Sequence, residues 1–246
     1  MKALIPAAGL GTRWYPWSKI LPKELLPLGK FPAIHYCLEE IGRTEITQIG
    51  IIINERKELI RKYVNTIWKP EHPDIQISWF YQSPPRGVAD ALICARSWIQ
   101  NEPVAVLYPD EIHPLRGGII QLCTMYEFIK GHLVGLTKNK QNRRQGVLKV
   151  KKIDSDIYHV QGSSSHISDD KIAFGTGRYI IENGFNHISK SKHHKMIQDS
   201  KDFDDDCFFK PLWQQNVKGI FLNEPIYDVG TPENWSQALN GTMCAS

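Results

Sequence analysis

The sequence predicts an α/β fold, because apolar runs of strand length alternate with segments of helical periodicity. The 246 residues, 41% of them hydrophobic, are sufficient for one sizeable core. Repeated strand-helix-strand order in the first half indicates a mostly parallel sheet that helices cover on both faces. The chain contains no internal repeat or clear linker. We therefore expect one domain over residues 1–246 with an elaborated C-terminal half.

The expected elements of the first half follow this alternation. Strands are expected at residues 2–7, 46–53, 76–82 and 104–110, and helices at 33–42, 58–68 and 88–99. The helical segments carry apolar residues on one stripe, which is typical of a helix that packs on a sheet.

The second half has a looser pattern. Strands are expected at residues 132–138, 171–181 and 219–230, a hairpin at 146–160, an exposed helix or loop at 189–206, a core-packing segment at 208–216 and a helix at 231–239. An Asp-Ser-Asp turn predicts the hairpin, and Thr231 followed by Pro232 is a typical helix start.

Charge and cysteine content limit the class of partner. The 30 basic and 26 acidic residues are spread along the chain, which suits a small anionic ligand and does not require nucleic acid. The five cysteines show no CxxC spacing of a zinc or redox site, so reduced thiols in the cytoplasm are expected. Pro6 and the glycines interrupt the first apolar run, unlike a secretory signal, and no segment approaches transmembrane length. We expect no contact with a membrane.

The segment IPAAGLGTRWYPWSKILPKELLPL, residues 5–28, is the most informative part of the chain. Glycines directly after a buried strand let backbone N–H groups approach a phosphate. A dinucleotide-binding loop would have a third glycine where this chain has Trp14, and the Gly-Lys-Ser/Thr of a Walker loop is absent. Neither familiar phosphate-binding loop therefore fits.

Two cations follow the glycines. Arg13 offers a bidentate fork to phosphate oxygens and Lys23 a point charge, as a triphosphate and its leaving group require. We expect Pro16, Pro22 and Pro27 to hold the segment extended and stiff. An ordinary surface loop with solvated charges is the alternative, and the whole segment disfavours it.

AAGLGTR, PKELLPL and FPAIHY together resemble the signature of the nucleoside-diphosphate-sugar pyrophosphorylases, in particular the UTP:glucose-1-phosphate uridylyltransferases and their thymidylyltransferase relatives. The order of later motifs extends the resemblance over most of the chain. It implies a Rossmann-like three-layer nucleotidyltransferase fold with a mixed, mostly parallel central sheet. It also implies a nucleotide-binding half at residues 1–130 and a sugar-phosphate-binding half at 131–246.

The resemblance assigns a nucleotide site to two segments. Its residues would be Ala8, Gly9, Gly11, Thr12, Gln82 and Gly87. In QSPPRGVADA, Gln82 can donate and accept, as the edge of uracil or thymine requires, and Gly87 would make room for the ring. A glutamine in this position taken alone is more often an ordinary strand-end residue, but the spacing of Gln82 to GVADA favours the base-binding role.

Two aspartates match the metal ligands of that family. Asp110 ends the strand in VAVLYPDEI, and Asp228 stands in YDVGTPENW near the C-terminus. Carboxylates from two distant strands could hold one Mg²⁺, with phosphate oxygens and water completing its octahedron. Each aspartate singly could instead be a turn residue that bonds nearby backbone N–H groups.

The acceptor side departs from the family pattern. Gly146 in RQGVLKV and Tyr179 in GTGRYII match its sugar-binding segments. The Glu-Lys-Pro motif that normally lies between them is missing, and Gly162-Ser163-Ser164 stands in its place. The lysines that could substitute, among which the sequence does not choose, are Lys149, Lys151, Lys152 and Lys171.

The resemblance implies attack by a sugar-1-phosphate oxygen on the α-phosphorus of UTP or dTTP, with release of pyrophosphate. Catalytic roles would fall to Arg13 on the pyrophosphate, Lys23 near the α-phosphate and Asp110 on Mg²⁺. The alternatives are another phosphorylated acceptor or an inactive nucleotide-binding relative. A nicotinamide-dependent oxidoreductase is disfavoured by the missing third glycine. A homo-oligomer is left open.

Overall fold

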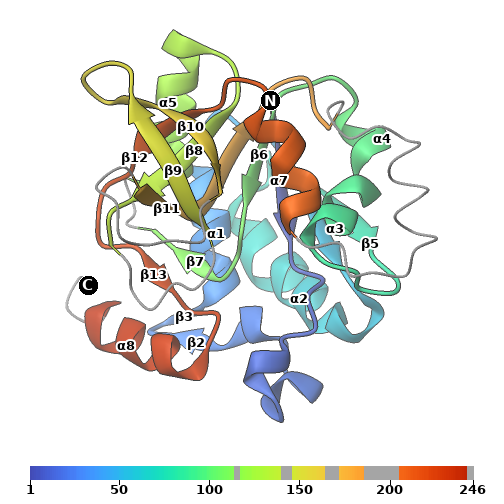
Figure 1. The fold of residues 1–246 in the computed structure, drawn as a ribbon. Helices are drawn as coiled ribbons and strands as arrows, with labels where there is room; N and C mark the ends of the chain where they lie inside the picture. Colours follow the sequence, from blue (N-terminus) through green and yellow to red (C-terminus); the bar gives the residue numbers. More distant parts are fainter. Residues whose placement is uncertain (114–116, 140–145, 164–171, 186–204, 243–246) are drawn as a thin grey trace.

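The computed structural model describes residues 1–113, 117–139, 146–163, 172–185 and 205–242 (Figure 1). Within these ranges the strands form a nine-stranded sheet of order β5-β4-β1-β6-β11-β8-β12-β10-β9. Its strands are β1 (Lys2–Pro6), β4 (Gln48–Ile53), β5 (Gln76–Tyr81), β6 (Val104–Leu107), β8 (Leu133–Thr137), β9 (Val147–Lys152), β10 (Ile157–Ser163), β11 (Ile172–Ile181) and β12 (Lys218–Phe221). Two separate short pairs are β2 (Pro27–Leu28) with β3 (Phe31–Pro32), and β7 (Glu111–Ile112) with β13 (Tyr227–Asp228).

The two halves of the main sheet differ in strand direction. In the N-terminal half, β1 runs parallel to β4 and β6, and β4 runs parallel to β5. In the C-terminal half, β11 runs antiparallel to β6 and β8 and β10 runs antiparallel to β9 and β12, whereas β12 runs parallel to β8. The sheet is therefore mixed, as predicted, with parallel pairing in its first half and mostly antiparallel pairing in its second half. A short connection such as that between β9 and β10 can join only antiparallel strands.

Helices flank the sheet. They are α1 (Ala33–Gly42), α2 (Glu58–Tyr63), α3 (Val88–Cys94), α4 (Arg96–Ile99), α5 (Ile119–Ile129), α7 (Asp205–Trp213) and α8 (Pro232–Thr242). Single turns are η1 (Thr12–Trp14), η2 (Trp17–Lys19), η3 (Lys23–Leu25), η4 (Glu55–Lys57), η5 (Val64–Trp68) and η6 (Lys69–Glu71). Helix α1 has the predicted bounds, and Thr231 caps α8 by accepting the Asn234 N–H at 3.2 Å. The predicted helix at 88–99 is divided at Ala95, and α5 was not predicted.

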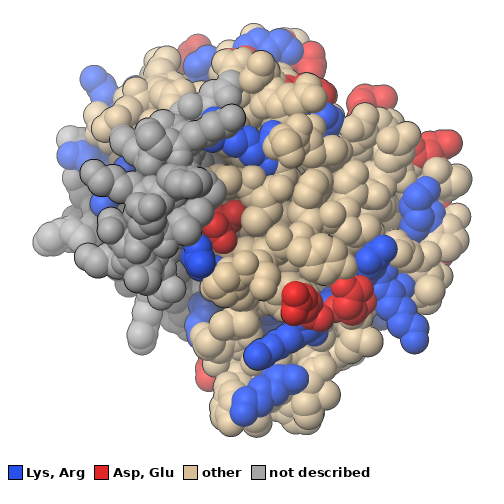
Figure 2. All heavy atoms as spheres, turned by 90° about the vertical axis from the view of Figure 1, so that its right-hand side faces the viewer, with Lys and Arg blue, Asp and Glu red and all other residues tan. Residues whose placement is uncertain are grey.

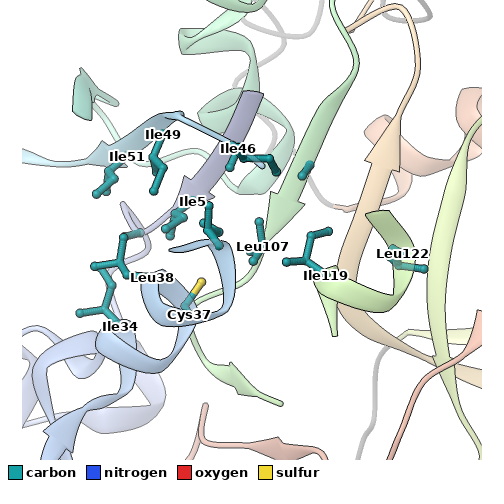
Figure 3. Packing of buried hydrophobic residues seen from close by; sticks show 14 of the residues in the cluster. Ile5, Ile34, Cys37, Leu38, Ile46, Ile49, Ile51, Leu107, Ile119 and Leu122 are labelled. Atoms are coloured by element: carbon teal, nitrogen blue, oxygen red, sulfur yellow. The ribbon is translucent and has the colours of Figure 1, made fainter. Parts of the chain in front are cut away.

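Two apolar clusters lie on opposite faces of the sheet. Because successive strand residues point to opposite faces, Ile5 packs in the cluster with α1 and α5, whereas Leu4 packs in the other. Figure 3 shows the first cluster, in which Leu38 and Cys37 of α1 lie against Ile5 and Leu107. The second cluster includes the predicted core-packing segment, whose buried residues are Phe209, Leu212 and Trp213 of α7.

Two further predictions need correction. The segment from Pro16 to Pro27 is not extended but folds into the turns η2 and η3, since the fixed φ of proline also suits the start of a helical turn. The predicted strand at 219–230 is divided into β12 and β13, because Pro225 has no N–H to continue the ladder. Except for its last two residues, the segment 189–206 lies outside the described residues.

The charged side chains are spread over the surface and the described cysteines are free, as the composition predicts. Figure 2 shows acidic and basic side chains interspersed on one face, with uncharged surface between them. No helix in the described ranges has the length and hydropathy needed to cross a membrane. Cys37, Cys94 and Cys123 are free, and burial raises their pKa values to about 12, 11 and 12. Cys207 and Cys244 lie outside the residues whose side chains are described.

Candidate active site

A cavity of about 1190 Å³ opens where the parallel strands β1, β5 and β6 end. The carboxyl ends of parallel strands are the usual location of ligand sites in open α/β sheets. All of the predicted site residues except Gly11 and Thr12 line this cavity: Ala8, Gly9, Arg13, Lys23, Gln82, Gly87, Asp110, Gly146, Tyr179 and Asp228. Segments far apart in the sequence therefore meet at one site.

The two glycines of the first loop have different tasks. Gly9 lines the cavity, and a Cβ there would meet no protein atom within 4 Å. Gly11 does not line the cavity, and it stands at φ +64° before η1, where a Cβ would lie 3.2 Å from Ser18 Cβ. Glycine at position 11 is therefore needed for the turn, whereas at position 9 it leaves the backbone accessible from the cavity. Thr12 begins η1 and lies off the cavity wall.

Lys23 and Asp110 form an ion pair on the cavity wall, with the Lys23 ammonium donating to Asp110 Oδ2. Burial opposes both charges, but the mutual attraction outweighs it. The pKa of Lys23 is consequently raised, and the pKa of Asp110 is lowered by Lys23 and by Arg13. Both groups are therefore charged at neutral pH.

A second buried ion pair holds the turn that carries Lys23. Glu24, also on the cavity wall, accepts two hydrogen bonds from Lys57 Nζ, at 2.8 and 2.7 Å. Both side chains are almost fully buried, so the pair fixes η3 against the start of α2. This pair could not be foreseen from the sequence, because Lys57 stands in the short polar stretch between the expected strand 46–53 and the expected helix 58–68, where a lysine is unremarkable.

Asp228 reaches Asp110 through the short pair β7 and β13. This pairing places Asp228 opposite Glu111, and the Val229 N–H donates to the Asp110 carbonyl at 2.7 Å. The Asp228 carboxylate accepts the Gly230 N–H at 2.7 Å and the Asn234 amide at 3.3 Å. Two aspartates from distant parts of the chain are thus brought to one edge of the cavity.

Gly230 leaves space between the charged groups of the site. A Cβ at this position would lie 2.9 Å from both Arg13 Nη2 and Asp228 Oδ1, and 3.2 Å from Asp110 Oδ2. Two carboxylates that face one small volume fit a hard divalent cation such as Mg²⁺, which takes few protein ligands. In the described part of the chain no group of three or more His, Cys, Asp or Glu residues is arranged to hold a metal ion, and Asp110 and Asp228 are the two carboxylates that approach the space at Gly230.

Gln82 lines the wall of the cavity where the resemblance places the base. Its amide nitrogen donates to the Gly87 carbonyl at 2.9 Å and to Asp90 Oδ2 at 2.8 Å. Both amide protons are therefore used inside the protein, and the amide oxygen keeps the capacity to accept. Gly87 stands at φ +100° before α3, a conformation that L side chains rarely adopt.

The acceptor side is formed largely by backbone and one ring. Gly146 stands at φ +78°, its carbonyl accepts the Gly175 N–H at 2.8 Å, and Tyr179 lies nearby on the wall. Among the described residues, the cations that line the cavity are Arg13 and Lys23. Of the lysines that could replace the missing motif, Lys149, Lys151 and Lys152 are exposed on β9 and do not line it, and Lys171 lies outside the described residues.

A family profile described as nucleotidyl transferase matches residues 2–243. The chain belongs to the nucleotidyl transferase family. It is 32% identical to a Bacillus subtilis UTP–glucose-1-phosphate uridylyltransferase over 60% of this chain and 58% of that relative. A second B. subtilis relative is covered over 66% of its length, so the chain spans less than two thirds of either protein.

Solved structures share the fold of this nucleotidyl transferase family member. The crystal structure of an apo UDP-glucose pyrophosphorylase superposes with a TM-score of 0.80 at 21% identity, covering 99% of this chain and 98% of that one. A UDP-glucose pyrophosphorylase complexed with UDP-glucose gives 0.78 at 20% identity, covering 100% and 99%. The match to this mixed-sheet fold therefore extends over the whole chain.

The loop that carries Asp110 is held by residues for which the sequence offered no signal. Arg178 on β11 is fully buried and binds the carboxylate of Glu40 on α1, with Nη2 to Oε2 at 2.7 Å. Glu40 lies in an otherwise apolar helix stripe, and Arg178 lies inside a run that reads as strand. The local pattern predicts a helix around Glu40 and a strand around Arg178, but it does not indicate that either charged side chain is buried.

Proposed function

We propose that the chain is a nucleotidyltransferase that joins UTP to a sugar-1-phosphate, giving a nucleoside-diphosphate sugar and pyrophosphate. The observation that carries the proposal is the meeting of Arg13, Lys23, Asp110 and Asp228 at one cavity. The names of the relatives support this reaction and favour UTP over dTTP as the donor.

The nucleotide is placed by two walls of the cavity. The triphosphate lies along the first loop, where Gly9 exposes backbone N–H groups and Arg13 and Lys23 supply positive charge. The base lies near Gly87, with its N3–H donated to the oxygen of Gln82, since the amide protons are already used. Gly87 and Val88 leave room for the ring.

The acceptor needs no general base. A phosphate monoester has a second pKa of about 6 and is mostly dianionic at neutral pH. The task of the protein is therefore to hold two anions in line despite their repulsion and to stabilise charge on the leaving pyrophosphate. Arg13 and Lys23 supply the stabilising charges, and Gly146 and Tyr179 contact the sugar.

Asp110 and Asp228 are the residues that would hold Mg²⁺. The bound ion would neutralise phosphate charge and orient the triphosphate. Lys23 pairs with Asp110 and keeps that carboxylate ionised, which is the form that binds a cation.

We further infer how the domain is organised and where in the cell it acts. Clusters of buried residues on both faces of the sheet support a Rossmann-like three-layer arrangement. Residues 1–130 form the nucleotide-binding half and 131–246 the sugar-phosphate-binding half of one domain. The free thiols of Cys37, Cys94 and Cys123 support a location in the reducing cytoplasm.

Pyrophosphate release tests the proposal. The purified chain is incubated with Mg²⁺ and UTP, dTTP, CTP or ATP, each with a panel of sugar-1-phosphates. We expect release with UTP and a hexose-1-phosphate, and none when Mg²⁺ or the acceptor is omitted. Release only with a non-hexose acceptor would point to the alternative suggested by the missing Glu-Lys-Pro motif. Tight UTP binding without release from any pair would contradict catalysis.

A further inference from the structure

We propose that Arg178 is a positioning residue, which sets the place of Asp110 by holding the backbone on both sides of it. This inference rests on the proposed function, because it gives Asp110 the role of a metal ligand. Arg178 touches neither the Asp110 side chain nor the cavity, so its effect would act through the loop between β6 and β7.

The guanidinium bridges two carbonyls that flank Asp110. Arg178 Nη1 donates to the Tyr108 carbonyl at 2.9 Å, and Nη2 donates to the Glu111 carbonyl at 2.8 Å. These two carbonyls belong to the residues two before and one after Asp110. A planar fork that spans both carbonyls restricts where the intervening residues can lie.

The remaining donors of Arg178 are also used. Nε and Nη2 bind the Glu40 carboxylate at 2.9 and 2.7 Å, and Nη1 also donates to the Gly177 carbonyl at 3.2 Å. All five N–H groups of the guanidinium therefore have partners. Glu40 in turn accepts the Ile119 N–H at the start of α5. The fork is thereby fixed between α1, α5 and β11.

Stability alone is a weak explanation for this arrangement. A buried ion pair often stabilises a protein no better than well-packed apolar residues of the same volume. Lysine could neutralise Glu40, but its single ammonium lacks the rigid fork needed to bind a carboxylate and two separated carbonyls together. The need for that geometry accounts for arginine at this fully buried position.

Other contacts hold the same loop against β11 and against the residue that follows β13. The Tyr108 N–H donates to the Gly177 carbonyl at 2.9 Å, and the Val229 N–H donates to the Asp110 carbonyl at 2.7 Å. Gly177 stands at φ +64°, where a Cβ would lie 2.9 Å from both Tyr108 Cβ and Glu111 Cγ. Because the loop is packed this closely, loss of the hydrogen bonds from Arg178 to the Tyr108 and Glu111 carbonyls should displace Asp110.

The test compares Arg178→Lys with the wild type. Lysine keeps one positive charge beside Glu40 but gives up part of the bridge between the carbonyls. We expect Mn²⁺, used as a probe alone and with UTP, to bind about tenfold more weakly by water-proton relaxation, a typical effect of losing an outer-shell partner. Hydrogen exchange of the amides at residues 108–112 should become faster. In turnover assays kcat should fall, while KM for UTP changes little.

Two further variants separate positioning from general destabilisation. Ile41→Val removes one buried methyl group from α1 beside Glu40, so it should lower the melting temperature without changing Mn²⁺ affinity. If Arg178→Lys does not fold, Glu40→Gln replaces it, because a neutral amide holds the guanidinium less firmly. The same changes are then expected at a smaller size.

The readouts also separate this inference from the proposed function. The wild type could release no pyrophosphate while Mn²⁺ binding is lost in Asp110→Asn and weakened in Arg178→Lys. That result would support the positioning role of Arg178 and contradict the proposed transferase function. A folded Arg178→Lys variant with wild-type Mn²⁺ affinity and wild-type hydrogen exchange would overturn the inference. Mn²⁺ binding that Asp110→Asn leaves unchanged would overturn it as well.

Discussion

The two halves of the chain contribute different kinds of chemical group to the cavity wall. The N-terminal half contributes ionised side chains, namely Arg13, Lys23 and Asp110, from loops that follow parallel strands. From β9 to β11 the C-terminal half contributes glycine backbone and the ring of Tyr179, and beyond β12 it contributes Asp228, Thr231, Glu233 and Asn234. Under the proposed function, the fixed charges would act on the phosphates, whereas glycine backbone and the Tyr179 ring would contact the sugar.

The sheet explains this division. Parallel strands bring the ends of β1, β5 and β6 to one edge, so their loops can gather charges around a phosphate. In the antiparallel half, the long strand β11 passes the cavity with its middle, and glycines there expose backbone. Asp228 and Glu233 are the acidic residues of this half on the described cavity wall, and β13 leaves the main sheet to pair with β7, which brings Asp228 to the edge where Asp110 lies.

The largest effect is expected from Asp110→Asn on the phosphate side. The amide keeps the size of the side chain but cannot hold a cation as a carboxylate does, so kcat should fall by about 10³-fold or more. Steady-state pyrophosphate release measures the loss, and circular dichroism checks that the fold is retained. Near-normal turnover would remove Asp110 from the reaction.

Lys23→Ala should reduce kcat by about 10²-fold, because one stabilising charge near the α-phosphate is lost and Asp110 loses its partner. Lys19→Ala is the matched control on the same segment. Lys19 is exposed and lies over the Tyr15 ring, away from the cavity wall, so its loss should leave kcat unchanged. Equal effects of the two substitutions would mean that only the overall charge of the segment matters.

The glycines of the first loop should respond differently to alanine. Gly9→Ala meets no protein atom, so stability should be unchanged, while KM for UTP rises about tenfold because the Cβ obstructs the phosphate. Gly11→Ala should instead cost about 1 to 2 kcal/mol of unfolding free energy, since alanine disfavours a positive φ. Melting curves and UTP titrations measure both quantities. A Gly9→Ala variant with unchanged KM would place the triphosphate elsewhere.

The smallest effect is expected on the sugar side. Tyr179→Phe keeps the ring contacts with Tyr108 and Phe209 but removes the hydroxyl, so KM for the sugar-1-phosphate should rise only about threefold. KM for UTP should not change. A loss as large as that of Lys23→Ala would show that the two sides of the cavity do not differ as described.

Much of this could be predicted from the sequence, for physical reasons. Periodicity determined α1 and the strands β1, β4 and β6, because their apolar residues repeat with the period of the element. The glycine loop and the two aspartates stand in continuous motifs, and the structure brings them to one cavity.

What the sequence did not predict depends on contacts between distant segments. The pairs Glu24–Lys57 and Arg178–Glu40 join residues far apart in the chain, and neither partner breaks its local pattern. The hairpin of β9 and β10 was predicted from its turn, but the antiparallel placement of β11 was not, because apolar runs do not encode strand direction. The turns η2 and η3 were missed because proline is compatible with extended and with helical backbone.

Gly230→Ala tests most directly the claim that groups from both halves converge on one reacting centre. Gly230 belongs to the C-terminal half, and its Cβ would reach Arg13 and Asp110 of the other half as well as Asp228. We predict an intact fold with kcat lowered by about 10²-fold, since a displacement of about 1 Å at such a site is costly. Wild-type turnover by a folded Gly230→Ala variant would contradict the account.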